Sequence, residues 1–225
     1  MSMVSELTDS VWRLELRGVN AYLVDDDVLT LVDAGTPFDE DTLRAGIDEI
    51  GFTVSDIERV LLTHYDLDHV GTLALLEPEL DAEVYVGAFD GALLTGELSP
   101  PLMNHKGALQ RALGAFVTTP SLAVQIVKDG DQIGSFTAYH TPGHSPGHYA
   151  YVSADLRVGL LGDLVTESGG RLEPSSWPMS YDSGRVRDSV RALAERVPEF
   201  EVACMGHGTP LVSGGSEALR AATSR

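Results

Sequence analysis

Short apolar runs of strand length repeatedly end in a histidine or an aspartate. The run 57–63 leads into the loop "HYDLDHVG", and four other runs end in a similar way. Runs of this length, bounded by polar or glycine-containing turns, are typical of buried strands. Because functional side chains commonly lie where strands end and loops begin, the pattern predicts a site at these strand ends. The residues concerned are Asp33, His64, Asp66, Asp68, His69, His144, His148, Asp163 and His207.

The order of predicted elements indicates two similar halves, each with several strands and one or two helices. Two such halves favour two sheets packed face to face with helices outside, within one domain over 1–225. The segment 91–125 lacks a clear period apart from a possible helix at 108–116, so it is a candidate lid or pocket wall. Strands are predicted at 11–16, 20–24, 28–33, 57–63, 82–88, 123–127, 136–141, 148–153, 157–163 and 200–206, and helices at 36–51, 68–80, 183–197 and 215–222.

The charge balance excludes some classes of partner. The chain has 34 acidic and 15 basic residues, for a net charge of −19, and Lys106 and Lys128 are its only lysines. Such a surface repels phosphate backbones and anionic membranes, so we expect neither nucleic acid nor membrane as a partner. This composition fits a halophilic protein, whose self-repulsion is screened by salt; an acidic protein of an ordinary cytoplasm is the alternative.

Cysteine content and the lengths of the apolar runs favour a soluble, intracellular protein. Cys204 is the only cysteine, so no intrachain disulfide is possible, and its apolar surroundings predict a buried thiol. We find neither a signal-peptide pattern nor an apolar run of about 18 residues. The expected localisation is cytoplasmic.

The residue types at the strand ends are those of a metal site. Imidazole binds zinc, iron and manganese, and carboxylates bind harder ions and can bridge two of them. His64 and Asp66 can face one metal while Asp68 and His69 face a second, since alternate side chains of an extended segment share a face. Two metals about 3.5–4 Å apart can share a hydroxide nucleophile, which would make a Ser or Cys nucleophile unnecessary.

These motifs together resemble the metallo-β-lactamase superfamily. The matching stretches are the Asp of "VDAG", the loop "HYDLDH", the first His of "HSPGH", the Asp of "LLGD" and the His of "GHG". The resemblance implies the α/β (α+β) class and a four-layer αββα sandwich of two mixed sheets, with a dinuclear metal site at one edge. The turn "TPGHSPGH" is similar to the glyoxalase II and acyl-homoserine-lactonase branch.

The resemblance also implies a role for each residue. His64, Asp66 and His144 would hold the first metal, and Asp68, His69 and His207 the second. Asp163 would bridge the two metals, and Asp68 would also handle a proton, which makes these two aspartates the catalytic candidates. Asp33 would orient the loop without being a ligand.

Asp66 departs from the family pattern, which has a histidine there. With Asp66, Asp68, Asp163 and a hydroxide, the charge of two divalent metals is cancelled, whereas a histidine would leave one positive charge. Zinc is the first expectation for both metals, and the extra carboxylate makes manganese or iron an alternative.

Several other residues near the motifs have two interpretations. His148 is interpreted as a core residue or one that supports a ligand, with direct ligation as the alternative. We expect Tyr65 and Tyr149 to pack, although either could donate to a substrate oxyanion. His105 and Lys106 are expected in a solvated loop tip, with contact to an anionic substrate as the alternative.

The leading functional hypothesis is a metal-dependent hydrolase that acts on an ester, thioester or lactone, or less favourably on a phosphodiester. The first alternative is an iron-dependent oxidoreductase similar to the sulfur dioxygenases of this superfamily. The second is a non-catalytic module whose metal stabilises the fold. We expect a small-molecule substrate; a homodimer is one option for the oligomeric state.

Overall fold

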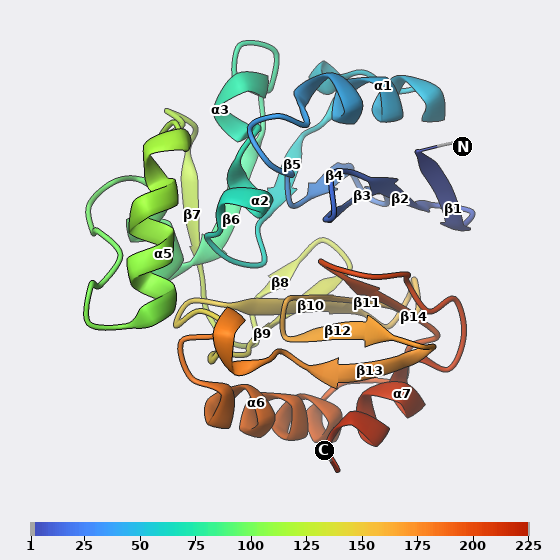
Figure 1. Cartoon of the computed structure of the whole chain (residues 1–225). Helices are drawn as coiled ribbons and strands as arrows, with labels where there is room; N and C mark the ends of the chain where they lie inside the picture. The colour runs from blue at the N-terminus through green and yellow to red at the C-terminus, as the bar shows by residue number, and fades with distance from the viewer. Residues whose placement is uncertain (1–2, 225) are drawn as a thin grey trace.

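The computed structural model describes residues 3–224, in which two β-sheets face each other (Figure 1). The larger sheet has seven strands in chain order, antiparallel from β1 to β4 and parallel from β4 to β7. Its strands are β1 (Val4–Thr8), β2 (Val11–Glu15), β3 (Asn20–Asp25), β4 (Leu29–Val32), β5 (Arg59–Leu61), β6 (Glu83–Gly87) and β7 (Val124–Val127).

The second sheet has the strand order β14-β11-β10-β9-β8, and β11 pairs parallel with β14. Its strands are β8 (Gln132–Ile133), β9 (Phe136–His140), β10 (Tyr149–Ser153), β11 (Val158–Gly162) and β14 (Val202–Met205). A separate hairpin is formed by β12 (Val165–Ser168) and β13 (Arg171–Pro174). The strands β1, β8, β12 and β13 were not predicted from the sequence.

Helices cover the outer faces of both sheets, so the predicted four-layer αββα sandwich is confirmed (Figure 1). The first sheet is covered by α1 (Glu40–Ile50) and α3 (Leu73–Leu76), and the second by α6 (Ser183–Arg196) and α7 (Gly215–Ala222). The remaining helices are α2 (Leu67–Val70), α4 (Ala88–Leu94) and α5 (His105–Leu113), with 3₁₀ turns at Val54–Asp56, Gly114–Phe116 and Trp177–Met179.

The period-two alternation of side chains along each central strand explains these layers. In β3, Tyr22 and Val24 point between the sheets, where they join Phe136 and Tyr151 in one core cluster. Leu23 points the other way and packs in a cluster with Leu43 of α1. Successive side chains of a strand face opposite sides, so a strand buried on both faces is apolar throughout. The sandwich therefore buries each sheet between its partner sheet and its helices.

The helix predicted at 68–80 is wrong as a single helix, because the structure divides it into α2 and α3. Backbone bonds that would continue the helix go instead to the loop after β4: Gly71 N–H donates to the Gly35 carbonyl at 2.8 Å. A Cβ at Gly71 would lie 2.4 Å from Pro37, so only glycine permits this approach. The break fixes the loop of Asp66 and His69 against the end of β4.

The segment 91–125 is more regular than predicted. Helix α5 begins three residues earlier than expected, because the Asn104 side chain accepts from the backbone N–H groups of Lys106 and Gly107 and caps the helix. In Figure 1, α5 stands beside β7 at one side of the two sheets.

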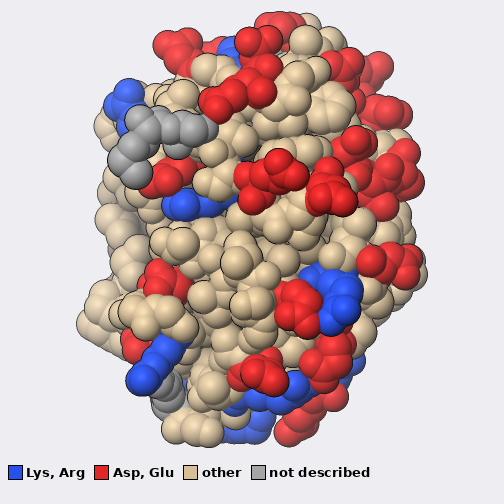
Figure 2. All heavy atoms as spheres, turned by 90° about the vertical axis from the view of Figure 1, so that its right-hand side faces the viewer, with Lys and Arg blue, Asp and Glu red and all other residues tan. Residues whose placement is uncertain are grey.

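The acidic character predicted from composition is visible at the surface. Figure 2 shows one face on which Asp and Glu side chains outnumber the few Lys and Arg side chains. Cys204 is buried, as expected. Within residues 3–224, none of the helices combines the length and the apolar character needed to cross a bilayer.

Candidate metal centre

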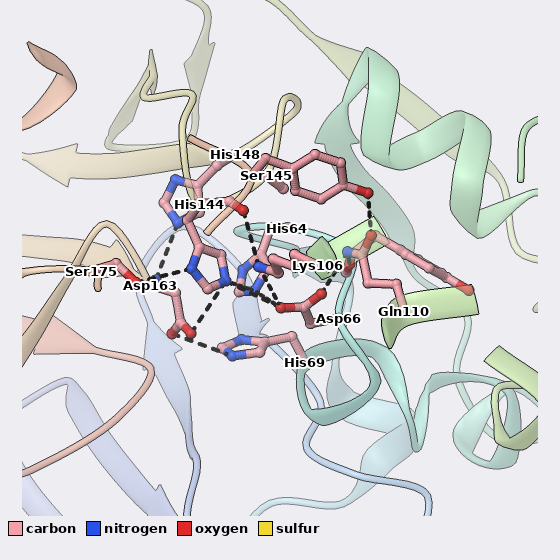
Figure 3. Close-up of polar contacts among 12 residues, drawn as sticks. His64, Asp66, His69, Lys106, Gln110, His144, Ser145, His148, Asp163 and Ser175 are labelled. Carbon is pink, nitrogen blue, oxygen red and sulfur yellow. Dashed lines mark hydrogen bonds and ion pairs between the residues drawn. The ribbon is translucent and has the colours of Figure 1, made fainter. Parts of the chain in front are cut away.

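The first of two side-chain clusters contains His64, Asp66 and His144 (Figure 3). His64 and Asp66 lie in the loop after β5, and His144 lies in the loop between β9 and β10. The two Nε2 atoms are 3.0 Å apart, and Asp66 Oδ2 lies 3.2 Å from His64 and 3.1 Å from His144. Ligands of one tetrahedral metal lie roughly 3.3 Å from each other, so the three atoms are spaced for a common ion.

The second cluster contains Asp68, His69, Asp163 and His207, which also come from strand ends of both sheets. His207 Nε2 lies 3.4 Å from Asp68 Oδ2 and 3.2 Å from Asp163 Oδ2. His69 Nε2 lies 3.4 Å from Asp163 Oδ1. These separations also suit one metal.

Asp163 lies between the two clusters. Its Oδ2 is 3.4 Å from His144 Nε2 of the first cluster and 3.2 Å from His207 Nε2 of the second. The carboxylate follows β11 directly, at the edge where β11 and β14 end side by side. All seven residues predicted as ligands are thus brought together, and the position of Asp163 suits a bridge.

Outer hydrogen bonds orient the histidine rings of both clusters. His69 donates from Nδ1 to Asp33 Oδ2 at 2.8 Å, and His207 donates from Nδ1 to the Gly18 carbonyl at 2.7 Å. Since a carboxylate and a carbonyl can only accept, Nε2 of each ring is left for the site. His64 and His144 are held similarly through Nδ1, by Thr63 Oγ1 at 3.0 Å and Ser175 Oγ at 3.1 Å.

The electrostatics of the second cluster couple these histidines to the carboxylates. Burial alone would lower the pKa of His69, but Asp33 and Asp163 raise it well above its ordinary value. Burial alone would also lower the pKa of His207, but Asp163 and Asp68 raise it to about 10. Burial alone would raise the pKa of Asp163, but His69 and the other imidazoles hold it well below its usual range. A metal ion entering the cluster would displace the protons of these histidines.

Polar atoms without partners show that the residues fit a metal. Within the part of the chain that the structure describes, His69 Nε2, Asp163 Oδ1 and His207 Nε2 are buried and form no aligned hydrogen bond. Their contacts with one another are ion-pair distances only. A Cβ at Gly206 would lie 2.0 Å from Asp163 Oδ1, so the backbone leaves just enough room for this cluster. Unpaired buried ligand atoms are costly unless an ion satisfies them.

Lys106 and Gln110 of α5 cover Asp66, which the sequence did not predict. Lys106 Nζ lies 2.8 Å from Asp66 Oδ2 and donates to the His144 carbonyl at 3.0 Å. Gln110 Nε2 donates to Asp66 Oδ1 at 2.6 Å and to the Tyr65 carbonyl at 2.7 Å. The expectation that Lys106 lies in a solvated loop tip is wrong, because its side chain is only 3% exposed on a helix that packs over the site.

The charge of Lys106 acts on both sides of this contact. Burial alone would raise the pKa of Asp66, but Lys106 and His64 hold it well below its ordinary value. Burial and the same ammonium lower the pKa of His144 to about 4. His144 is therefore neutral near pH 7, which is the state in which imidazole binds metals.

His148 supports Asp163. The Asp163 backbone N–H donates to His148 Nε2 at 3.1 Å, which leaves Nδ1 to donate to Thr141 Oγ1 at 2.8 Å. Both ring nitrogens are thus engaged, as expected for a residue that supports the site.

The other uncertain residues are placed as follows. Tyr149 is buried and its ring lies against His140, 5.1 Å between centroids. Tyr65 is 8% exposed and packs in the first core cluster, although it also lines the cavity described below. His105 is exposed and stacks on Trp177, with 4.5 Å between the ring centroids.

Asp90 of α4 ties two ligand loops together, and the sequence analysis missed it. Its carboxylate accepts from the Tyr65 N–H at 3.0 Å, the Gly147 N–H at 3.1 Å and the Ser145 hydroxyl. Burial raises the pKa of Asp90 above its ordinary value. The one signal for Asp90 in the sequence was an isolated acidic residue three positions after the end of a strand, in an otherwise apolar stretch.

A cavity of about 280 Å³ opens beside the clusters. Asp66 and Asp68 lie in its wall, and α5 forms another part of the wall. A smaller cavity of about 190 Å³ adjoins Asp163 and His207. The larger cavity is lined mainly by apolar side chains: Leu67, Leu109, Leu113, Val117, Pro178 and Met179.

Comparison with known proteins identifies the family of this chain. Residues 14–207 match the model of the metallo-β-lactamase superfamily. The chain belongs to the metallo-β-lactamase superfamily.

Relatives of this superfamily member extend over most of its length. It is 30% identical to YobT of Bacillus subtilis, over 96% of this chain and 95% of that one. It is also 30% identical to the probable metallo-hydrolase YqjP of Bacillus subtilis, over 87% and 68% of the two chains.

Solved structures agree with the fold of this superfamily member. BJP-1, a subclass B3 metallo-β-lactamase of Bradyrhizobium japonicum, superposes with a TM-score of 0.71 at 22% identity, over 99% and 90% of the two chains. TTHA1623, whose structure holds two irons, gives 0.67 at 30% identity, over 89% and 92%. Both solved structures thus share the two-sheet sandwich of this chain.

Proposed function

We propose that this metallo-hydrolase cleaves an acyl bond in a small ester, thioester or lactone. The observation that carries the proposal is the set of buried, unpaired ligand atoms of His69, His207 and Asp163 beside an apolar cavity. A divalent metal bound there would lower the pKa of a coordinated water and supply hydroxide at neutral pH, as well as polarise the carbonyl. Zinc fits the histidine-rich donor set, and Asp66 makes manganese or iron an alternative.

Asp163 and Asp68 have separate roles in this proposal. Asp163 holds the two clusters together, since it contacts His144 on one side and His207 on the other. Asp68 lines the cavity and is partly exposed. Burial raises the pKa of Asp68, but His207 and His69 lower it below the ordinary value overall. Asp68 is therefore ionised near pH 7 and can take a proton from water and return it to the leaving group.

The cavity wall favours an acyl group over a phosphodiester. Most of the surface that its wall exposes is apolar, so an alkyl chain would be buried favourably there. Two cations reach the cavity, Arg17 and Lys106, and Lys106 is already paired with Asp66. The "TPGHSPGH" turn, similar to the glyoxalase II and lactonase branch, agrees with an acyl substrate. Fold likeness to β-lactamases does not carry their substrate.

The experiment is hydrolysis by the full chain after chelation and reconstitution with zinc, manganese or iron. The panel contains p-nitrophenyl esters of increasing acyl length, matched thioesters and lactones, a β-lactam and a phosphodiester. We expect metal-dependent turnover of the acyl compounds, with kcat/KM rising with acyl length. Failure to hydrolyse any of them in all three metal forms would refute the proposal.

A pair of variants tests the assigned pocket. Leu113→Trp places a larger ring in the cavity wall and should lower kcat/KM for long acyl chains more than for short ones. The matched control is Leu102→Trp, because Leu102 is exposed and outside the lining of this cavity. If Leu113→Trp changed kcat/KM equally for long and short acyl chains, as Leu102→Trp should, the acyl group would bind outside this cavity.

A second candidate function is iron-dependent oxidation, similar to that of sulfur dioxygenases. It is favoured by the carboxylate of Asp66 in the first cluster and by the two irons of the relative TTHA1623. Its test is the iron content of the purified chain, with oxygen uptake in the presence of a small persulfide. Colourless protein rich in zinc, without oxygen uptake, would exclude it.

A further inference from the structure

The two clusters differ in formal charge once their histidines are in the neutral form that binds a metal. In the first, the carboxylate of Asp66 is cancelled by the ammonium of Lys106, 2.8 Å away. In the second, Asp68 and Asp163 contribute two negative charges, and within residues 3–224 neither carboxylate forms an ion pair with a Lys or an Arg. A divalent cation is therefore attracted more strongly to the second cluster.

The hydrogen bonds of the two clusters also favour metal binding at the second cluster. Both oxygens of Asp66 already accept from α5, Oδ2 from Lys106 and Oδ1 from Gln110 at 2.6 Å. Ligand atoms without an aligned partner, by contrast, belong to His69, His207 and Asp163 of the second cluster. An ion thus gains more by entering the second cluster, where it satisfies groups that the protein leaves unpaired.

Helix α5 holds Lys106 firmly in this place. The side chain is 3% exposed and also donates to the His144 carbonyl. Tyr181 donates its hydroxyl to Gln110, which lies one helical turn after Lys106 on the same face of α5. The ammonium is therefore a fixed part of the first cluster and does not sample the solvent as a surface lysine would.

We propose that Lys106 is a built-in cation that makes the His64–Asp66–His144 cluster the weaker of two unequal metal sites. The Asp68–His69–His207 cluster, completed by Asp163, then holds the resident metal. This inference rests on the metal centre of the proposed function, but it concerns affinity and needs no substrate.

The test is a zinc titration of the chelator-treated full chain in competition with a chromophoric chelator. Two binding steps of unequal affinity are expected for the unmodified chain. Lys106→Met should tighten the weaker step by on the order of tenfold or more, since a nearby positive charge is removed, and leave the tighter step unchanged. Lys128→Met is the matched control, because Lys128 is the other lysine and is exposed; it should change neither step.

Two further variants assign the steps without touching Lys106, so the test survives if Lys106→Met fails to fold. His64→Ala should abolish the weaker step alone, and His207→Ala should abolish the tighter one. Three outcomes would each overturn the inference and leave the proposed function standing. They are two steps of equal affinity in the unmodified chain, a weaker step that Lys106→Met leaves unchanged or weakens further, and loss of the tighter step in His64→Ala with loss of the weaker step in His207→Ala. A chain that binds none of zinc, manganese and iron would overturn the proposed function as well.

Discussion

Asp33 Oδ2 and His69 Nδ1 are joined by a hydrogen bond of 2.8 Å, which decides which ring nitrogen faces the second cluster. The same carboxylate accepts from the backbone N–H and the hydroxyl of Thr63, both at 2.8 Å. Asp33 adopts a φ of 56°, a left-handed conformation that Asp tolerates better than most residues. One side chain thus orients a candidate ligand and the start of the ligand loop.

Asp33→Asn should weaken metal binding at the second cluster by about 10- to 100-fold, because an amide nitrogen in that place cannot accept from His69. Competition with a chromophoric chelator would measure this change. Asp155→Asn, at an exposed position, should leave the affinity unchanged. Equal affinities for the two variants would mean that the Asp33 bond does not orient His69 toward a metal.

Asp90→Ala should lower the free energy of unfolding by about 1–3 kcal/mol for each buried donor left without a partner. Tyr65 N–H and Gly147 N–H are the two backbone donors concerned. Urea unfolding of the metal-free chain measures the loss, and Asp90→Asn, which keeps one acceptor, should lose less. Equal losses would show that burial of the side chain matters and its hydrogen bonds do not.

Gly206→Ala should abolish metal binding at the second cluster while secondary structure persists. The added Cβ would meet Asp163 Oδ1 at 2.0 Å and His69 Cε1 at 2.7 Å, so the two ligands must move. Gly114→Ala is the control, because a Cβ there has open space around it. Zinc per chain after dialysis is the measurement, and an unchanged content in Gly206→Ala would contradict the assigned geometry.

Removal of metal should lower the unfolding temperature, because an ion that binds only the folded chain stabilises it by about 2.7 kcal/mol at a concentration 100 times its dissociation constant. Calorimetry of the chelated and reconstituted chain provides the comparison. His207→Ala should respond less to added zinc than the unmodified chain. The same unfolding temperature for the chelated and the reconstituted chain would argue against a resident ion.

Added potassium chloride should raise the unfolding temperature between about 0.1 M and about 2 M, because salt screens repulsion within a chain of net charge −19. The acidic face in Figure 2 is part of that charge. An uncharged solute at equal osmolality is the control. Equal stabilisation by both solutes would point to exclusion from the surface and not to screening.

The sequence by itself determined the sandwich and the residues that meet at its edge. The mostly apolar run of a stretch such as 20–24 is a local property, and it is typical of a strand that is buried on both faces. Asp163 and His207 follow parallel neighbouring strands, so their meeting follows from the strand order once the fold is known. The break between α2 and α3 escaped prediction because it depends on a backbone bond to Gly35, which no local pattern shows.

Only the tertiary structure decided what surrounds the candidate ligands. Lys106 reaches His144 across 38 positions, and Gln110 reaches Asp66 across 44. Asp90 joins Ser145 across 55. A buried lysine and an exposed one have the same letter in a sequence, and the difference arises from which helix packs over which loop. The ligand types were therefore set by chemistry at strand ends, whereas the charge balance of the two clusters was set by long-range packing.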